Sequence, residues 1–186
     1  IPWLANATAY RTISALAGKL GTRACTILGT DLVFNRESLT AQKLTLLRDP
    51  AIEGSFDLAM PLYDTQAFDD LVNKSILYPL TRALYGHRVH NPLGNEFQMS
   101  SKLFPVLSAD APRDSTRQQG RLLWLATIAA NRGLKICQVR LGTRRPPGSD
   151  GIELSDALAQ LAGPLFLDME DNAAFWQRIR GSHEVP

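Results

Sequence analysis

The sequence has little of what marks secreted, nucleic-acid-binding or membrane-spanning proteins. Its 186 residues carry a net charge of only +2, from 20 basic and 18 acidic residues. A nearly balanced charge gives no electrostatic reason to bind nucleic acid. No apolar run approaches the roughly 18 residues of a transmembrane helix, and the start lacks the charged and apolar regions of a signal peptide. We therefore expect no nucleic-acid partner and no transmembrane segment.

Cysteine and histidine are also scarce. The two cysteines, Cys25 and Cys137, each lie inside an apolar run, ACTIL and KICQV. Free cysteine is among the most buried residue types, so this placement favours two buried thiols in adjacent strands over a disulfide or a metal pair. Such cysteine usage is typical of a cytoplasmic protein.

What is present is an ordinary globular composition. Hydrophobic residues make up 45% of the chain and charged residues 20%, which suits one domain over residues 1–186 with a sizeable core. The sequence begins without methionine and close to a helical pattern. We therefore expect it to be the C-terminal portion of a longer protein.

Hydrophobic periodicity predicts helices separated by short buried strands. Proline and glycine set several predicted ends: Pro50 beyond the second helix, Pro61 at a strand end, Pro79 as a kink and Gly86 as a stop. A short helix is expected over residues 99–107 within an otherwise irregular segment. The predicted helices span residues 5–20, 37–48, 69–85, 119–131 and 154–180, with a break at 163–164, and the strands span 23–28, 56–62 and 134–141.

This alternation predicts an α/β fold, a partial Rossmann-like and mostly parallel sheet flanked by helices. Ligands of open α/β sheets bind beyond the carboxyl ends of the strands. The residues that follow Leu28, Leu62 and Leu141 are therefore the first candidates for a site.

The richest stretch runs from Ser75 to Ser101, SILYPLTRALYGHRVHNPLGNEFQMSS. An amphipathic helix leads into a basic segment and then into a turn with proline and glycine. Its basic side chains can bind a phosphate or carboxylate by charge-assisted hydrogen bonds, or they can be solvated cations at a helix end and on a strand. These residues are Arg82, His87, Arg88 and His90.

This stretch and several others together resemble a known family. The match runs from Arg11 to Pro186 and also includes the predicted helix before the first strand. The other segments are ACTILGTDL, FDLAMPLY, GLKICQVRLG and FWQRIRGSHEVP, beside YPLTRALYG and NPLGNEF. In this order they are similar to the second half of GT-A fold nucleotide-sugar glycosyltransferases, in the subgroup of mannosylglycerate synthase and glucosyl-3-phosphoglycerate synthase. The resemblance implies sugar transfer from a nucleotide-sugar donor to a small hydroxy acid or related acceptor, assisted by a divalent cation.

The resemblance also implies a metal position. Members carry Asp-x-Asp at the first strand end, where two carboxylates hold Mg²⁺ or Mn²⁺ against the donor diphosphate. This chain has Gly29-Thr30-Asp31, so Asp31 is the one candidate metal ligand. The alternative for Asp31 is a polar residue that begins a turn.

Two further segments match sites of the family. The turn Gly94-Asn95-Glu96-Phe97 matches Gly-Gly-Asp/Glu-Phe/Tyr, which implies that Glu96 is the catalytic candidate, able to orient a hydroxyl or accept its proton. Gly94, Asn95 and Phe97, together with Arg82 and Arg88, then become candidates for donor or acceptor binding. Arg144 and Arg145 after the last strand are candidates for the diphosphate. The alternatives are an exposed turn glutamate and a charged loop.

The chain departs from the family at other positions. An acidic residue at a helix start is replaced by Leu122, and residues 142–146, directly after the last predicted strand, contain no histidine. The sequence therefore leaves two hypotheses: a sugar transferase, or a degenerate homologue that acts as a binding or assembly module. An incomplete sheet edge would in either case favour a homo-oligomer.

Overall fold

A four-stranded sheet forms the centre of the molecule. The computed structural model describes residues 7–28, 40–64, 73–92, 96–110, 121–143 and 165–186. The strand order is β1-β4-β2-β5, and β4 runs antiparallel to both neighbours while β2 and β5 are parallel. Three of the four strands therefore share one direction, although two of the three pairings are antiparallel because β4 lies between β1 and β2. The strands are β1 (Ala24–Ile27), β2 (Leu58–Asp64), β4 (Phe97–Ser100) and β5 (Ile136–Thr143).

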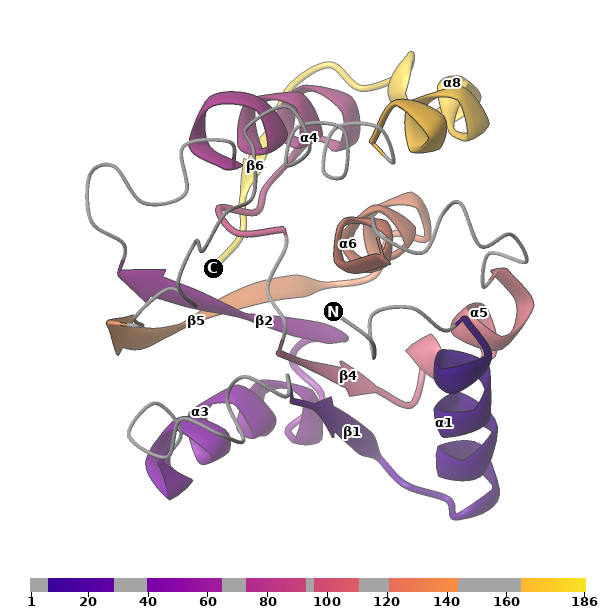
Figure 1. The fold of residues 1–186 in the computed structure, drawn as a ribbon, viewed down its shortest axis with the longest axis vertical. Helices are drawn as coiled ribbons and strands as arrows, with labels where there is room; N and C mark the ends of the chain where they lie inside the picture. Colours follow the sequence, from indigo (N-terminus) through magenta and orange to yellow (C-terminus); the bar gives the residue numbers. More distant parts are fainter. Residues whose placement is uncertain (1–6, 29–39, 65–72, 93–95, 111–120, 144–164) are drawn as a thin grey trace, which may run out of the picture.

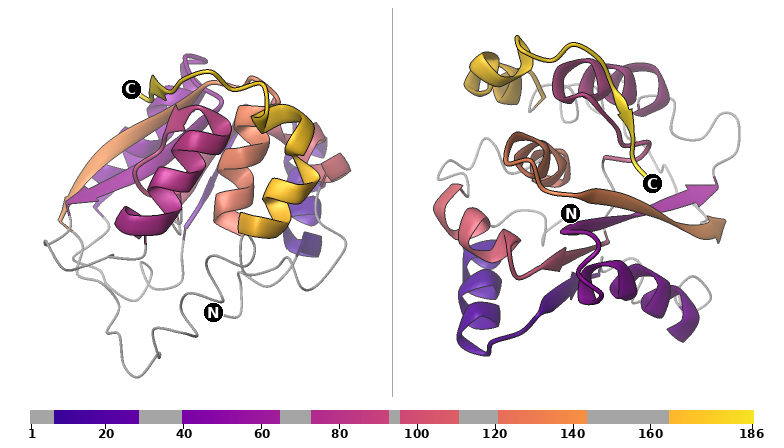
Figure 2. Two further views of the ribbon diagram at one scale, coloured as in Figure 1. Left: turned by 90° about the horizontal axis from the view of Figure 1, so that it is seen from above. Right: turned by 180° about the vertical axis from the view of Figure 1, so that it is seen from behind.

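Helices cover both faces of this sheet, which confirms the α/β class. Helix α3 lies on one face, and α4, α6 and α8 lie on the other (Figures 1 and 2). Helices α1 and α5 pack against each other beside the sheet. The described bounds are α1 (Ala7–Lys19), α3 (Ala41–Ile52), α4 (Tyr78–Tyr85), α5 (Leu103–Asp110), α6 (Arg121–Asn131) and α8 (Ala173–Trp176). None of the described helices is long and apolar enough to cross a membrane.

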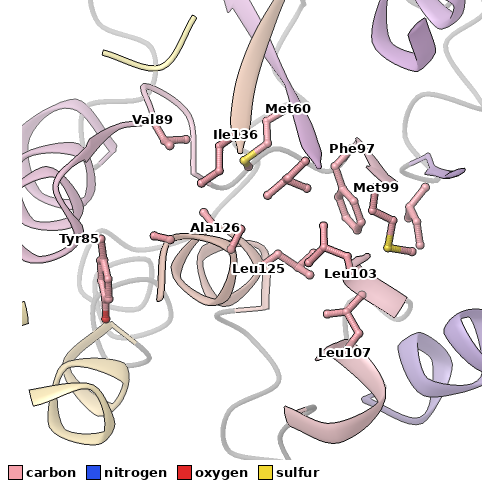
Figure 3. Close-up of a cluster of buried hydrophobic side chains, with 14 of the residues drawn as sticks. Met60, Tyr85, Val89, Phe97, Met99, Leu103, Leu107, Leu125, Ala126 and Ile136 are labelled. Carbon is pink, nitrogen blue, oxygen red and sulfur yellow. The ribbon is translucent and has the colours of Figure 1, made fainter. Parts of the chain in front are cut away.

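The core divides across the sheet because successive strand residues point to opposite faces. Leu58 and Met60 face the larger cluster, which α4, α5 and α6 complete (Figure 3). Ala59, between them in sequence, joins a smaller cluster with Leu47 of α3 and with Cys137. Both clusters exclude solvent where they meet β2, since Leu58 and Ala59 have no exposed surface.

Strand β4 lies in the segment predicted to be irregular. All four of its residues are buried, and they pair with β1 from Ala24 to Ile27 and with Leu58 and Ala59 of β2. These pairings are separated by about forty to seventy residues of sequence, so local patterning does not reveal them. The short helix expected at residues 99–107 is found as α5, which begins after β4 ends.

Two prolines do not end the elements in which they occur. Pro50 lies inside α3, which begins after an N-cap at Thr40, and not beyond the helix end. Pro61 lies within β2, which continues to Asp64. The registered pairs with β4 stop at Ala59, so β2 has no described partner there on that side. A residue without an amide hydrogen is tolerated at such a position.

The other two predicted breaks are confirmed. A π-helical turn, η2 (Asn73–Leu77), precedes α4, and Pro79 stands in the first turn of α4. Gly86 ends α4 with a φ of 70°, which favours glycine.

The C-terminal segment does not continue as a helix to residue 180. Residues 165–171 are helical, α8 ends at Trp176, and the chain then turns. It finishes in β6 (His183–Glu184), which pairs in parallel with β3 (His87–Arg88). The chain leaves the helix and reaches β3, a partner strand 96 residues earlier in the sequence, so local periodicity does not reveal this turn.

The two cysteines are free, as predicted, but their strands are not adjacent. Cys25 is on β1 and Cys137 is on β5, the two outer strands of the sheet. Strands β4 and β2 lie between them, because β4 enters the sheet from a segment that the sequence pattern did not mark as a strand.

Candidate functional site

Glu96, the predicted catalytic residue, lies at one end of the sheet strands. Strands β1, β2 and β5 run in the same direction, so their carboxyl ends lie at one edge. Strand β4 runs the opposite way and therefore begins there. Glu96, which immediately precedes β4, lies at the same edge as the end of β2.

Glu96 is buried and bonded to a tyrosine. Its side chain has no exposed surface, so the alternative of an exposed turn glutamate is wrong. The Tyr63 hydroxyl donates a hydrogen bond of 3.2 Å to Oε2 of Glu96. The two residues come from neighbouring strands and are 33 positions apart. A buried carboxylate needs such donors, because leaving it without them is costly.

The pairing of β2 with β5 becomes irregular beside the tyrosine. Leu62 pairs with Arg140 and Tyr63 with Gly142, so β5 carries the extra residue, Leu141. A bulge of this kind bends the strand that carries it and increases the local twist beside Tyr63. Tyr63 is the first residue after the shift, and it is 7% exposed.

Tyr63 also lines a pocket of about 400 Å³. The pocket opens between the end of β2, the η2 turn and the segment after β3. Tyr63 therefore joins a buried acid to an open cavity, since its hydroxyl bonds Glu96 while its surface faces the pocket. The lining residues are Leu62, Tyr63, Asn73, Lys74, Tyr78, His90 and Asn91.

His90 is held in place from three sides. Its ring stacks on Tyr78, with 4.7 Å between ring centroids and 14° between planes. The Asn73 amide donates to its carbonyl at 2.8 Å, and its backbone N–H donates to Gln138 Oε1 at 3.0 Å. The pocket thus has a rigid aromatic wall built from α4 and the segment after β3.

The remaining wall is polar. Lys74 is exposed on η2, and an ammonium group can pair with a phosphate or carboxylate. Asn91 and Asn73 carry amides, which can hydrogen-bond hydroxyl groups. A cavity with a cation, amides and flat aromatic faces suits a small polyhydroxylated or hydroxy-acid molecule with one anionic group.

The structure separates the predicted basic cluster into two parts. His90 lines the pocket described above. Arg82 and Arg88 both donate to the hydroxyl of Ser182, and Arg82 lines a different hollow. Of the four residues in the predicted basic cluster, His90 is thus the one that lines the pocket beside Glu96.

The structure describes one of the other predicted site residues. Phe97 opens β4 and packs in the core, where 1% of the residue is exposed. Five candidates lie outside the described residues, and their roles stay predictions: Asp31, Gly94, Asn95, Arg144 and Arg145.

A second buried acid, Asp57, has a structural role. Burial raises its pKa. Hydrogen bonds from the Lys135 amide and the Ser100 hydroxyl, together with the Lys102 ammonium, lower the pKa by more, so it lies below its ordinary value. Lys135 N–H lies 3.0 Å and Lys102 Nζ also 3.0 Å from the carboxylate. Asp57 precedes β2, at the end of the sheet strands opposite Glu96. There it links the start of β2 to the end of β4 and to the segment before β5.

The described residues do not assemble a metal site. Within these ranges no group of three histidine, cysteine, aspartate or glutamate side chains gathers closely enough to hold an ion. The one predicted ligand, Asp31, lies outside them. The fit of a divalent cation therefore depends on residues 29–39.

Sequence reasoning missed most of the pocket. The rule that sites follow strand ends pointed to the residue after Leu62, which is Tyr63. Asn73, Lys74 and Asn91 carried no signal of their own, because they are common surface residue types in a predicted helix and loop. A π-helical turn often marks a functional position, but it is not readable from this sequence.

Comparisons with known proteins give only distant similarity. No protein-family model and no curated protein matches the chain. Two solved structures of glucosyl-3-phosphoglycerate synthase from Mycobacterium tuberculosis, in complex with Mn²⁺, UDP-glucose and phosphoglyceric acid, are similar to it. The first has 16% identity and a TM-score of 0.47 over 89% of this chain and 57% of that chain. The second has 19% identity and a TM-score of 0.41 over 69% and 43%. The chain spans about half the length of these enzymes, and its function is inferred from its own residues.

Proposed function

We propose that this chain is the acceptor-side portion of a GT-A-like glycosyltransferase, which moves a sugar from a nucleotide-sugar to a small hydroxy acid or related anionic acceptor. The observation that carries the proposal is Tyr63, which bonds the buried Glu96 and also lines the pocket at the sheet edge. The family resemblance of the sequence around NPLGNEF supports the same assignment for Glu96.

In this proposal the pocket holds the acceptor. Lys74 pairs with the acceptor's phosphate or carboxylate, and the Tyr78–His90 wall packs against its carbon skeleton. The Asn91 amide bonds a hydroxyl. An acceptor hydroxyl at the inner end meets the Tyr63 phenol, whose orientation Glu96 sets.

The transfer itself has a simple balance. The bond between the anomeric carbon and the donor phosphate breaks, and the nucleoside diphosphate leaves with the electron pair. The acceptor oxygen forms the new bond to that carbon and passes its proton to the Tyr63 hydroxyl, whose own proton moves to the Glu96 carboxylate. Tyr63 is the group placed to contact the reacting hydroxyl, and Glu96 is a positioning residue that acts through it.

A divalent cation stays part of the proposal through Asp31 alone. When bound, Mg²⁺ or Mn²⁺ would neutralise charge on the leaving diphosphate. No step above is routed through it, since the described residues supply no cluster of ligands.

The test is calorimetric titration of the chain with UDP- and GDP-sugars, with and without Mn²⁺, and separately with 3-phosphoglycerate as an acceptor probe. Lys74→Gln should weaken the acceptor probe about tenfold, because a charge-assisted hydrogen bond is lost. Lys19→Gln, an equal charge change on exposed α1 outside the pocket, should leave it unchanged. Equal weakening by both variants would contradict the assigned pocket.

The alternative function is a binding or assembly module without transfer. The sequence Gly29-Thr30 favours it, because the family resemblance implies an acid at the first of these two positions. Acceptor binding without metal-dependent donor binding would support this alternative. Metal-dependent donor binding that Asp31→Ala abolishes would support the transferase.

A further inference from the structure

Two arginines donate to one serine hydroxyl where the C-terminal segment passes α4. Nε of Arg82 lies 3.0 Å from Ser182 Oγ, and Nε of Arg88 lies 3.2 Å from the same oxygen. Arg82 comes from α4, Arg88 from β3, and Ser182 from the segment before β6. The two arginines lie 100 and 94 residues before the serine in the sequence, and both bond its Oγ atom.

The charges at this point are not balanced. Arg88 NH1 pairs with Glu184 at 2.9 Å, and the glutamate side chain is 83% exposed, so the pair is largely screened by water. Arg82 has no carboxylate partner among the described residues. A neutral hydroxyl cannot offset the repulsion of two guanidinium groups, so the cluster has a net positive charge that an anion would neutralise.

The convergence point lies beside a hollow of about 360 Å³. Arg82 and Ser182 supply its polar side, and a Cβ added to Gly181 would meet open space. Pro79, Ala83 and Ile179 supply an apolar side. The hollow therefore combines a cationic end with a hydrophobic wall.

We propose that this hollow binds a small molecule with a phosphate monoester and an apolar body. A phosphate group presents three oxygens, so it can accept from both guanidinium groups and from the Ser182 hydroxyl at once, whereas a carboxylate presents two. The apolar body then packs against Pro79, Ala83 and Ile179. The site is separate from the pocket beside Glu96, since the two have no lining residue in common.

Binding there would add a link between elements that already meet at this point. The phosphate would bridge α4, β3 and the C-terminal segment, which meet through the two-residue β3–β6 pairing, the bond from His183 N–H to Gly86 O and the bonds to Ser182. A ligand that binds only the folded arrangement stabilises it. The C-terminal strand should therefore become more protected when the hollow is filled.

The test is an NMR titration of the ¹⁵N-labelled chain with inorganic phosphate and with phenyl phosphate. The Nε–H signals of Arg82 and Arg88 and the amide signal of Ser182 should shift along one saturable curve. Phenyl phosphate should bind several-fold more tightly than inorganic phosphate, because its ring covers the apolar wall. Absence of a saturable shift at these positions would overturn the proposal.

Three variants make the test specific. Arg82→Gln should weaken phenyl phosphate about tenfold or more. Arg178→Gln removes the same charge from an exposed residue that bonds Ala174 O and does not line the hollow, so it should change affinity less than about twofold. Lys74→Gln alters the acceptor pocket and should leave the Arg82 and Arg88 shifts intact. If either control weakens binding as much as Arg82→Gln, the attraction is diffuse and the site is refuted.

An additional variant tests the site from within. Ser182→Glu places a carboxylate between the two arginines, which should mimic the bound anion. Phenyl phosphate should then no longer shift the Arg82 signal, and the thermal midpoint should stay equal or rise. A Ser182→Glu chain that still binds phenyl phosphate as tightly as the parent would refute the role of Ser182.

Discussion

The hydroxyl of Tyr63 donates to the buried carboxylate of Glu96 across 3.2 Å, and the same tyrosine forms part of a pocket wall. One side chain therefore connects an acid that has no exposed surface with a cavity that a ligand can enter. The pair also places the start of β4 beside the end of β2, beyond the registered pairing of these strands.

Tyr63→Phe removes this donor and should destabilise the fold by about 1–3 kcal/mol, because a buried carboxylate loses a hydrogen bond. Glu96→Gln should cost a similar amount. The double variant should cost less than the sum, since both changes remove one interaction. Denaturant unfolding of the four proteins measures this coupling, and strict additivity would show that the two groups do not interact.

Gly86→Ala should destabilise the protein more than Gly54→Ala. Both glycines have a positive φ, 70° and 77°, which costs another residue about 1–2 kcal/mol. At Gly86 an added Cβ would also lie 3.1 Å from Gly181 O and 3.2 Å from Ile179, whereas at Gly54 it would meet nothing within 4 Å. The difference, about 1 kcal/mol or more, is measured by thermal unfolding. Equal losses would mean that the C-terminal segment does not pack over Gly86.

His87 should make the fold less stable in mild acid. Burial lowers its pKa below the ordinary value of 6.5, and the neighbouring His183 lowers it further. Because the folded pKa is depressed, the unfolded chain binds more protons in this range, and stability is lost as the pH falls below 6.5 through the folded pKa.

Denaturation midpoints across this range should therefore fall with pH in the parent chain. His87→Gln should reduce that slope. His183→Gln should raise the pKa of His87, measured by NMR titration of the imidazole protons. A pKa for His87 that does not respond to His183→Gln would contradict the packing of β3 beside β6.

Cys137 should resist alkylation in the folded protein. Burial raises its pKa to about 11, and 4% of the residue is exposed. Since the thiolate is the reactive form, labelling at mildly alkaline pH should be roughly a hundredfold slower than for an unperturbed thiol. Cys25→Ser isolates this residue for mass spectrometry with iodoacetamide, and urea should restore ordinary labelling. Fast labelling without denaturant would show that β5 is not covered by α3.

Much of the local structure follows from the sequence. Periodicity predicted α1, α6 and the strands β1, β2 and β5, and Gly86 was predicted to end α4. These elements have strong apolar patterns and punctuation by glycine, which act over a few residues. Their predicted ends were less accurate where Pro50 and Pro61 lie within an element.

The candidate site was predicted only in part. Glu96 was identified through the resemblance of its turn, and the strand-end rule pointed to the position of Tyr63. The rest of the pocket depends on how η2 and the segment after β3 approach each other. His90 was grouped with Arg82 and Arg88 because they are close in sequence, whereas in the fold His90 lines one hollow, Arg82 lines another and Arg88 bonds Ser182 beside the second.

By itself the sequence determined the α/β class, the free thiols and the residue types available at the sheet edge. Apolar periodicity and turn chemistry act locally, so they can be read in one dimension. Tertiary structure alone decided that β4 enters the sheet between β1 and β2, that Tyr63 bonds Glu96 and that Ser182 joins two arginines. Each of these contacts links residues at least 33 positions apart, and such contacts depend on the packing of the whole core.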